Sequence, residues 1–216
     1  MPGYHPSVHA QSNPDALALV VADTGETLTY RQLEEGSNRV AHLLRGLGLQ
    51  PGDRVAVMMR NGPDFPMIYW GATRCGCFVT LLSTHLKPEE ASYIIGDSAS
   101  KVLFLSAEIG ETPRALAAQK RELVPNVNHV YAVGNEPIAG AEPLADAANA
   151  MPVTPVRDQI SGFHMIYSSG TTGRPKGIVL PFTPGPIDEF NMLEGYMPLY
   201  ETLEPLVYLN VGPLYH

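Results

Sequence analysis

Short apolar runs suited to buried strands alternate with helical segments between residues 55 and 133, and this alternation restricts the possible folds most strongly. The expected strands cover residues 55–59, 77–82, 101–105 and His129–Val133. The expected helices between them cover Asp64–Thr73, residues 88–95 and residues 112–123. Strands separated by helices in this way are typical of an α/β fold. We therefore expect a mostly parallel sheet flanked by helices.

One longer helix is expected before the first of these strands. Thr29 and Gln32 have the spacing of a capping box at its N-terminus. Apolar residues then follow at helical spacing, at Leu33, Val40, Leu43, Leu44 and Leu47. Gly46 and Gly48 mark the end of the helix. The apolar stripe is expected to pack on the core rather than to form a groove for a partner.

The chain after residue 133 predicts a connection followed by a second region. Residues 134–155 are rich in Ala, Pro, Gly and Glu, which indicates a surface connection. Residues 188–196 predict a helix, and residues 206–211 predict a last strand. We therefore divide the chain into residues 1–160, the alternating region, and residues 161–216, which hold a glycine-rich hairpin and the C-terminal part.

Residues 167–177 read YSSGTTGRPKG and carry the clearest functional signal. Three glycines let the backbone approach an anion, four hydroxyls lie between Ser168 and Thr172, and Lys176 adds a positive charge. This composition predicts a cradle for a polyphosphate such as ATP. The common phosphate loop has another pattern, GxxxxGK[ST] between a strand and a helix. Apolar residues on both sides of this run predict instead a strand, a glycine-rich loop and a second strand.

Two other interpretations of this run are disfavoured. A flexible Ser/Gly linker would not normally contain Pro175 and Lys176, and it would not be flanked by apolar strands. An acyl-enzyme hydrolase would need a nucleophile elbow, and the sequence has no GxSxG pattern.

The whole run resembles the phosphate-loop signature of the adenylate-forming enzymes. These are acyl- and aryl-CoA ligases, firefly-type luciferases and the adenylation domains of peptide synthetases. Weaker similarities lie at residues 28–33 (LTYRQL), 51–57 (PGDRVAV) and 213–216 (PLYH). The resemblance implies that residues 1–216 are an incomplete N-terminal domain of that fold, with the later subdomains and the C-terminal domain missing. The last residues would then begin the acyl-pocket region.

The resemblance implies roles for individual residues. ATP would be bound by Ser168, Ser169, Gly170, Thr171, Thr172, Gly173, Lys176 and Gly177. Thr171 or Thr172 would also approach Mg²⁺, and Lys176 would act in catalysis by neutralising the pyrophosphate that leaves. Tyr215 would line the substrate pocket, and His216 would orient the acid as a second catalytic residue. Family members often have a His-x-Asn segment after the loop, where this chain has Pro-Phe-Thr. The resemblance therefore predicts the loop itself but not the residues that surround it.

The function implied is that of an ATP-dependent acyl-CoA ligase. Such an enzyme activates a carboxylic acid, here fatty or aromatic, as an acyl-adenylate and transfers it to coenzyme A. These 216 residues alone are predicted to be inactive or nearly so, because the residues that complete the ATP site would follow His216. An adenylation domain of a peptide synthetase and a luciferase share the first step. A non-enzymatic module that binds a nucleotide or pyrophosphate is a further alternative.

Composition limits the possible partners and locations. A formal net charge of −8 disfavours nucleic acid. No apolar stretch reaches the roughly 18 residues of a membrane helix, and residues 1–16 show no secretory signal, so a cytoplasmic location is expected. Cys75 and Cys77 are expected to be buried reduced thiols rather than metal ligands. An apolar edge uncovered at residue 216 would favour self-association.

Overall fold

The computed structural model describes residues 5–168, 175–178, 184–187 and 207–215. Within them lies a seven-stranded sheet in the order β7-β6-β5-β3-β4-β8-β9. Its strands are β3 (Arg54–Met58), β4 (Phe78–Leu81), β5 (Val102–Ser106), β6 (His129–Val133), β7 (Glu142–Pro143), β8 (Phe163–Ser168) and β9 (Lys176–Ile178). All neighbours pair in parallel except β8 and β9, which are antiparallel. The predicted mostly parallel sheet is therefore confirmed.

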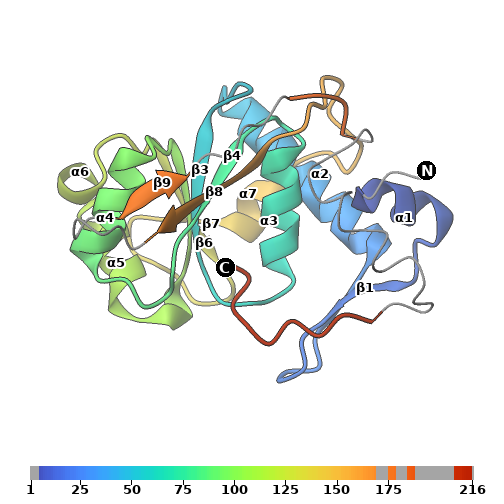
Figure 1. The fold of residues 1–216 in the computed structure, drawn as a ribbon, viewed down its shortest axis with the longest axis horizontal. Coiled ribbons are helices and arrows are strands. Elements are labelled where there is room, and N and C mark those ends of the chain that lie inside the picture. The colour runs from blue at the N-terminus through green and yellow to red at the C-terminus, as the bar shows by residue number, and fades with distance from the viewer. Residues whose placement is uncertain (1–4, 169–174, 179–183, 188–206, 216) are drawn as a thin grey trace.

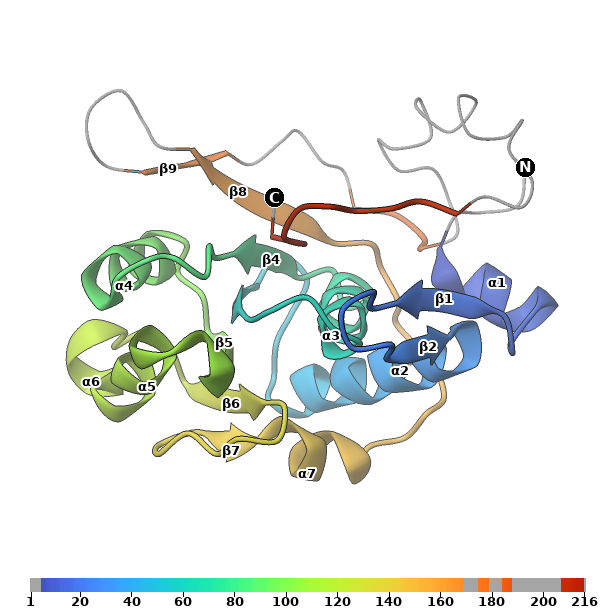
Figure 2. The ribbon, with the colours of Figure 1, turned by 90° about the horizontal axis from the view of Figure 1, so that it is seen from below.

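Helices cover both faces of this sheet. One face carries α2 (Tyr30–Gly46), α3 (Asp64–Thr73) and α7 (Leu144–Asn149), and the other carries α4 (Pro88–Asp97), α5 (Glu111–Ala118) and α6 (Lys120–Leu123). Figure 2 shows the sheet between these two groups. Alternate side chains of a strand point to opposite faces. Val55 and Val57 accordingly pack in the core under α2 and α3, whereas Ala56 and Met58 pack in the core under α4 and α5.

The order of the strands reverses at β3. The chain passes from β3 through α3 to β4 on one side, and then returns through α4 to β5 on the other side of β3. The two connecting helices lie on opposite faces (Figure 1), as right-handed crossovers in opposite directions require. In open α/β sheets, ligands bind beyond the carboxyl ends of the strands near such a reversal. The topology therefore predicts a ligand site at the loops that follow β3, β4 and β8.

Helix α2 begins and packs as its sequence predicts. Thr29 accepts a hydrogen bond from the backbone N–H of Gln32 at 3.2 Å, and the Gln32 side chain accepts one from the N–H of Thr29 at 2.9 Å. The helix crosses α3 closely at Gly71. A Cβ atom on Gly71 would lie 2.6 Å from Cβ of Val40 and 2.8 Å from the carbonyl oxygen of Ser37. A glycine is therefore needed at this crossing.

The N-terminal residues form elements that the sequence analysis does not predict. They are α1 (Pro6–Ser12) and an antiparallel pair, β1 (Leu17–Val20) with β2 (Thr27–Thr29). Gly25 makes the turn between the two strands, with a φ angle of 76°. The pair leads directly into α2, and Leu28 of β2 is buried.

Several predicted elements are corrected by the structure. The single helix expected at residues 112–123 is two helices, α5 and α6, because the backbone leaves the helical conformation at Gln119. The surface connection expected at residues 134–155 contains β7 and α7, because buried Leu144 anchors α7 on α2. The last strand expected at residues 206–211 is absent from the described residues 207–211, whose Val207 and Val211 are 87% and 91% exposed. The helix expected at residues 188–196 lies outside the described residues.

The two cysteines are buried, as predicted. Cys75 and Cys77 are free thiols in the core below α2 and α3. Burial raises the pKa of Cys75 to about 11 and that of Cys77 to about 12. Among the described residues, no helix combines the length and the apolar character that crossing a membrane requires.

Candidate active site

Strands β8 and β9 form the two stems of the glycine-rich run. They pair in antiparallel register, with Tyr167 opposite Gly177 and Ser168 opposite Lys176. The predicted arrangement of strand, loop and strand is therefore confirmed. The turn itself, residues 169–174 with Ser169, Gly170, Thr171, Thr172 and Gly173, lies outside the described residues.

The carboxyl end of β8, after which residues 169–174 follow in the chain, lies at the carboxyl edge of the sheet. β8 runs parallel to β4, with Phe163 opposite Phe78 and Met165 opposite Thr80. The chain therefore leaves β8 at the same edge at which it leaves β3 and β4. Ser168 and Lys176 are both exposed there. An exposed cation beside a loop rich in hydroxyl and N–H donors can bind an anion from solution.

Tyr167 and Gly177 fix the stem of the hairpin. The Tyr167 hydroxyl donates a hydrogen bond of 2.6 Å to a carboxylate oxygen of Asp97, at the end of α4. Burial raises the pKa of Tyr167, and the Asp97 carboxylate raises it further. A Cβ atom on Gly177 would collide with Cε of Met165 and would lie 3.0 Å from Cζ of Tyr167. Packing against the strand therefore explains Gly177, and its predicted contact with ATP stays a prediction.

A buried ion pair supports the N-terminal end of β8, opposite the end that leads into the glycine-rich run. Arg74 is fully buried and bonds to both carboxylate oxygens of Glu34 in α2, at 3.0 and 2.7 Å. The carbonyl oxygen of Arg74 accepts a hydrogen bond from the N–H of Ile160 at 3.2 Å. The carbonyl oxygen of Thr73, the residue before Arg74, accepts a hydrogen bond from the N–H of Gly162 at 2.6 Å. These contacts join α2, the end of α3 and the residues that lead into β8.

His164 on β8 has a partner that no sequence pattern indicates. Its Nδ1 atom lies 3.1 Å from the hydroxyl of Tyr69 in α3, and its ring stacks on Phe163. Burial lowers the pKa of His164. The side chain therefore acts in packing between β8 and α3, and the sequence pattern could not show this because the two residues lie 95 positions apart.

The C-terminal segment, residues 212–215, lies over the ends of β3 and β4. Tyr215 is 7% exposed, and its hydroxyl oxygen lies 3.4 Å from the hydroxyls of Ser83 and Thr84, just after β4. Burial alone would raise the pKa of Tyr215, but hydrogen bonds from these two hydroxyls and from the backbone of Thr84 outweigh burial and lower the pKa. Asn61, after β3, bonds to the backbone of the same segment. The predicted catalytic residue His216 lies outside the described residues.

The structure thus brings part of the predicted site to one edge of the sheet. Ser168, Lys176 and Gly177 lie on the hairpin, and Tyr215 lies on the segment held at the ends of β3 and β4. The sequence did not single out Asn61, Asp97, Ser83 and Thr84, whose contacts support these two segments. Their only sequence signal is their place directly after a predicted strand or at the end of a predicted helix.

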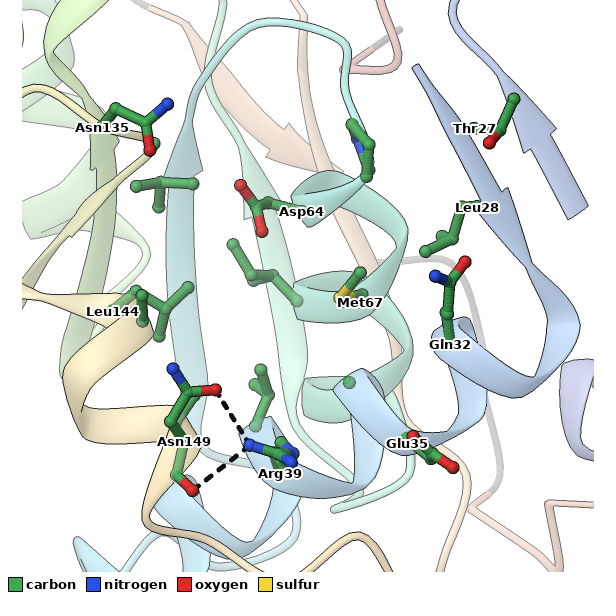
Figure 3. A pocket seen from close by; sticks show the side chains of 18 residues that line it. Thr27, Leu28, Gln32, Glu35, Arg39, Asp64, Met67, Asn135, Leu144 and Asn149 are labelled. Atoms are coloured by element: carbon green, nitrogen blue, oxygen red, sulfur yellow. Dashed lines mark hydrogen bonds between the residues drawn. The ribbon is translucent and has the colours of Figure 1, made fainter.

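A separate cleft of about 530 Å³ lies between α2, α3 and α7. Figure 3 shows Asp64 and Met67 on one side and Arg39, bonded to Asn149, on the other. Burial raises the pKa of Asp64, and the charge of Glu26 raises it further. None of the described residues of the hairpin or of the segment 212–215 lines this cleft. It is therefore distinct from the candidate site.

The part of the chain that the structure describes contains no cluster of three His, Cys, Asp or Glu residues suited to a metal ion. Thr171 and Thr172, the predicted contacts of Mg²⁺, lie outside that part. Their contact with Mg²⁺ therefore stays a prediction.

Comparison with known proteins defines the class. The family model described as AMP-binding enzyme matches residues 7–216, and the chain belongs to this family. The fatty acid–[acyl-carrier-protein] ligase ScoC of Streptomyces coeruleorubidus is 34% identical over 174 residues, which cover 81% of this chain and 31% of that protein. The 4-hydroxybenzoate–CoA/benzoate–CoA ligase of Rhodopseudomonas palustris is 33% identical over 169 residues, which cover 74% of this chain and 30% of that protein.

Solved structures agree with this assignment. The anthranilate CoA ligase AuaEII, in complex with anthranoyl-AMP, matches with a TM-score of 0.69 and 27% identity, over 86% of this chain and 35% of that one. The inhibitor-bound N-terminal domain of FACL13 from Mycobacterium tuberculosis matches with a TM-score of 0.68 and 30% identity, over 83% of this chain and 44% of that one. The fold is therefore that of the N-terminal part of the adenylate-forming enzymes. The chain spans about a third of the length of the curated relatives that it matches.

Proposed function

We propose that this chain is the N-terminal part of an AMP-forming acid–thiol ligase. The enzyme activates a fatty or aromatic carboxylic acid as an acyl-adenylate. One observation carries the proposal: the glycine-rich hairpin and the segment around Tyr215 both lie at the carboxyl edge of the sheet, one on β8 and the other over β3 and β4. A phosphate-binding loop and an acid-binding segment on one edge can hold the two reactants of adenylation together.

In this reaction the two segments have different roles: the hairpin binds ATP, and the segment around Tyr215 binds the acid. The acid's carboxylate oxygen attacks the α-phosphorus of ATP, the new O–P bond forms, and the bond to pyrophosphate breaks. Negative charge then grows on the leaving pyrophosphate. Ser168, residues 169–173 and Lys176 bind the β- and γ-phosphates, and the Lys176 ammonium stabilises that charge. Mg²⁺ near Thr171 or Thr172 would supply further charge stabilisation when bound.

Tyr215 and His216 serve the other reactant. Tyr215 lines the acid's pocket, with its hydroxyl fixed by Ser83 and Thr84. His216, the next residue, orients the carboxylate toward the α-phosphorus. Both reacting segments of this proposal lie in residues 161–216, the second of the two regions into which we divide the chain from its sequence.

Coenzyme A is the acceptor that we favour for the acyl group. Support comes from the aromatic-acid CoA ligases named above. The similarity to ScoC, a fatty acid–[acyl-carrier-protein] ligase, keeps a carrier-protein thiol as the second candidate. Competition between coenzyme A and acyl-carrier protein for the same acyl-adenylate would decide between them. The cytoplasmic location predicted from the sequence stays part of the proposal.

Exchange of pyrophosphate into ATP tests the adenylation step. The full-length gene product is incubated with ATP, labelled pyrophosphate and a panel of fatty and aromatic acids. We expect exchange that depends on at least one acid. ATP binding without acid-dependent exchange would instead favour a nucleotide-binding module. The 216-residue chain alone is expected to show little or no exchange.

A further inference from the structure

Asn61 makes a two-sided contact with the C-terminal segment. Its Nδ2 atom donates a hydrogen bond of 3.1 Å to the carbonyl oxygen of Gly212, and its Oδ1 atom accepts one of 2.8 Å from the N–H of Leu214. The side-chain amide therefore satisfies a donor and an acceptor two residues apart, as a neighbouring strand would. Asn61 itself lies just after β3, on the loop that leads to α3.

This contact matters because the preceding residues provide little attachment. Residues 207–211 belong to no strand, and their apolar side chains are largely exposed. Within this run, Asn210 accepts a hydrogen bond of 3.0 Å from the N–H of Gly212, a local contact two residues along the chain. Figure 2 shows the segment, in dark red, ending beside β4 and β8. The bonds to Asn61 and the buried ring of Tyr215 therefore hold its end in place.

We propose that Asn61 is a positioning residue for the acid substrate. Its amide fixes the backbone of residues 212–214, and thereby the side chain of Tyr215, at the carboxyl ends of β3 and β4. This inference rests on the proposed function, in which Tyr215 lines the acid's pocket. Asn61 does not touch the glycine-rich hairpin in any described contact. Its effect is therefore expected on the acid and not on ATP.

Three substitutions separate the two bonds of the amide. Asn61→Ala removes both. Asn61→Asp keeps an acceptor for the N–H of Leu214 but loses the donor to Gly212 and places a negative charge beside that carbonyl oxygen. Asn61→Gln keeps the amide on a longer side chain and is the conservative variant. Asn126→Ala, in an exposed turn far along the chain, is the matched control.

Hydrogen exchange tests the attachment in the full-length gene product without any need for activity. In Asn61→Ala and Asn61→Asp, the amide of Leu214 is expected to exchange at least about tenfold faster, because its acceptor is lost or the segment is loosened. Asn61→Gln is expected to restore part of the protection, and Asn126→Ala to leave it unchanged. Unchanged exchange at Leu214 in Asn61→Ala would overturn the proposal.

Steady-state kinetics of the same proteins tests the positioning role. We expect the KM for the acid to rise by about 10- to 100-fold in Asn61→Ala, as small displacements of a substrate do, while the KM for ATP stays within about twofold. Equal changes in both KM values, or an unchanged KM for the acid, would overturn the positioning role. A wild-type protein that activates no acid would refute the proposed function, and hydrogen exchange would still decide whether Asn61 holds the segment.

Discussion

At the residue scale, the site depends on a charged side chain at one position and on the lack of a side chain at the next. Lys176 supplies an exposed charge at the hairpin, whereas Gly177 beside it leaves room for Tyr167 and Met165. The two residues are neighbours in one motif, and yet the structure gives them different physical reasons. Membership of one motif therefore does not give the two residues the same role.

The close packing at Gly177 makes it sensitive to a single methyl group. Gly177→Ala places a Cβ against Met165 and Tyr167, and overpacking of this kind costs about 1–3 kcal/mol. We expect the free energy of unfolding in urea to fall by that amount. Gly46→Ala is the control, because a Cβ on Gly46 meets nothing within 4 Å. Equal stability of Gly177→Ala and the wild type would contradict the packing.

The buried cysteines give a second prediction at this scale. Burial raises the pKa of Cys77 to about 12, and burial also shields the thiol from reagents. Since the thiolate is the reactive form, we expect iodoacetamide at about pH 8 to label the native chain at least about 100-fold more slowly than the chain in urea. Mass spectrometry follows the labelling. Rapid labelling of the native protein would show that Cys75 and Cys77 are accessible.

At the element scale, the strands and helices are held by contacts between elements far apart in the chain. The Glu34–Arg74 pair joins α2 to the end of α3, and the backbone of Arg74 and Thr73 supports the residues before β8. Tyr167 then ties β8 to the end of α4 through Asp97. Contacts at both ends of β8 therefore hold in place the strand that leads into the hairpin.

The Glu34–Arg74 pair makes stability depend on pH. Burial alone would raise the pKa of Glu34, but the hydrogen bonds and charge of Arg74 outweigh burial and lower it below the ordinary 4.5. Between the lowered folded-state pKa of Glu34 and its ordinary pKa of 4.5, the unfolded state therefore binds more protons than the folded state. The stabilisation is therefore full above about pH 4.5 and is lost as the pH falls through the folded-state pKa.

We expect Glu34→Gln to lower the free energy of unfolding by about 1–3 kcal/mol at pH 7 and by less as the pH falls toward 3. Urea titrations at several pH values measure the difference from the wild type. Glu35→Gln, on the exposed side of the same helix, is the matched control. A difference that stays constant with pH would contradict the role of the Glu34 charge.

At the scale of the whole molecule, the sequence predicted the sheet and its helices well, because buried strands and amphipathic helices have their own periodicities. It also predicted the hairpin, because glycine and hydroxyl residues between two apolar runs leave few alternatives. It failed in two places. The composition of residues 134–155 hid α7, which buried Leu144 helps to hold in the core. The pattern of residues 206–211 predicted a strand, but Val207 and Val211 are exposed. Contacts such as those of Asn61 with Gly212 and Leu214 could not be predicted, because pairing across 151 to 153 residues leaves no local pattern.

The exposed apolar run at residues 207–211 bears on how the chain behaves in solution. Val207, Tyr208, Leu209 and Val211 are between 72% and 91% exposed. We propose that these side chains make the 216-residue chain self-associate. Sedimentation velocity is expected to show association that rises with concentration and weakens when Val207, Leu209 and Val211 are replaced by Ser. A wild-type monomer at all concentrations would refute this.

Formation of the acyl-adenylate by wild-type and Lys176→Ala forms of the full-length gene product tests the central claim most directly. The account predicts acid-dependent formation by the wild type, slowed by about 10²- to 10³-fold in Lys176→Ala, the usual effect of losing one transition-state charge contact. Lys120→Ala removes an equal charge from α6, away from the site, and is expected to keep the wild-type rate. Equal rates for wild type and Lys176→Ala, or no adenylate with any acid, would contradict the account.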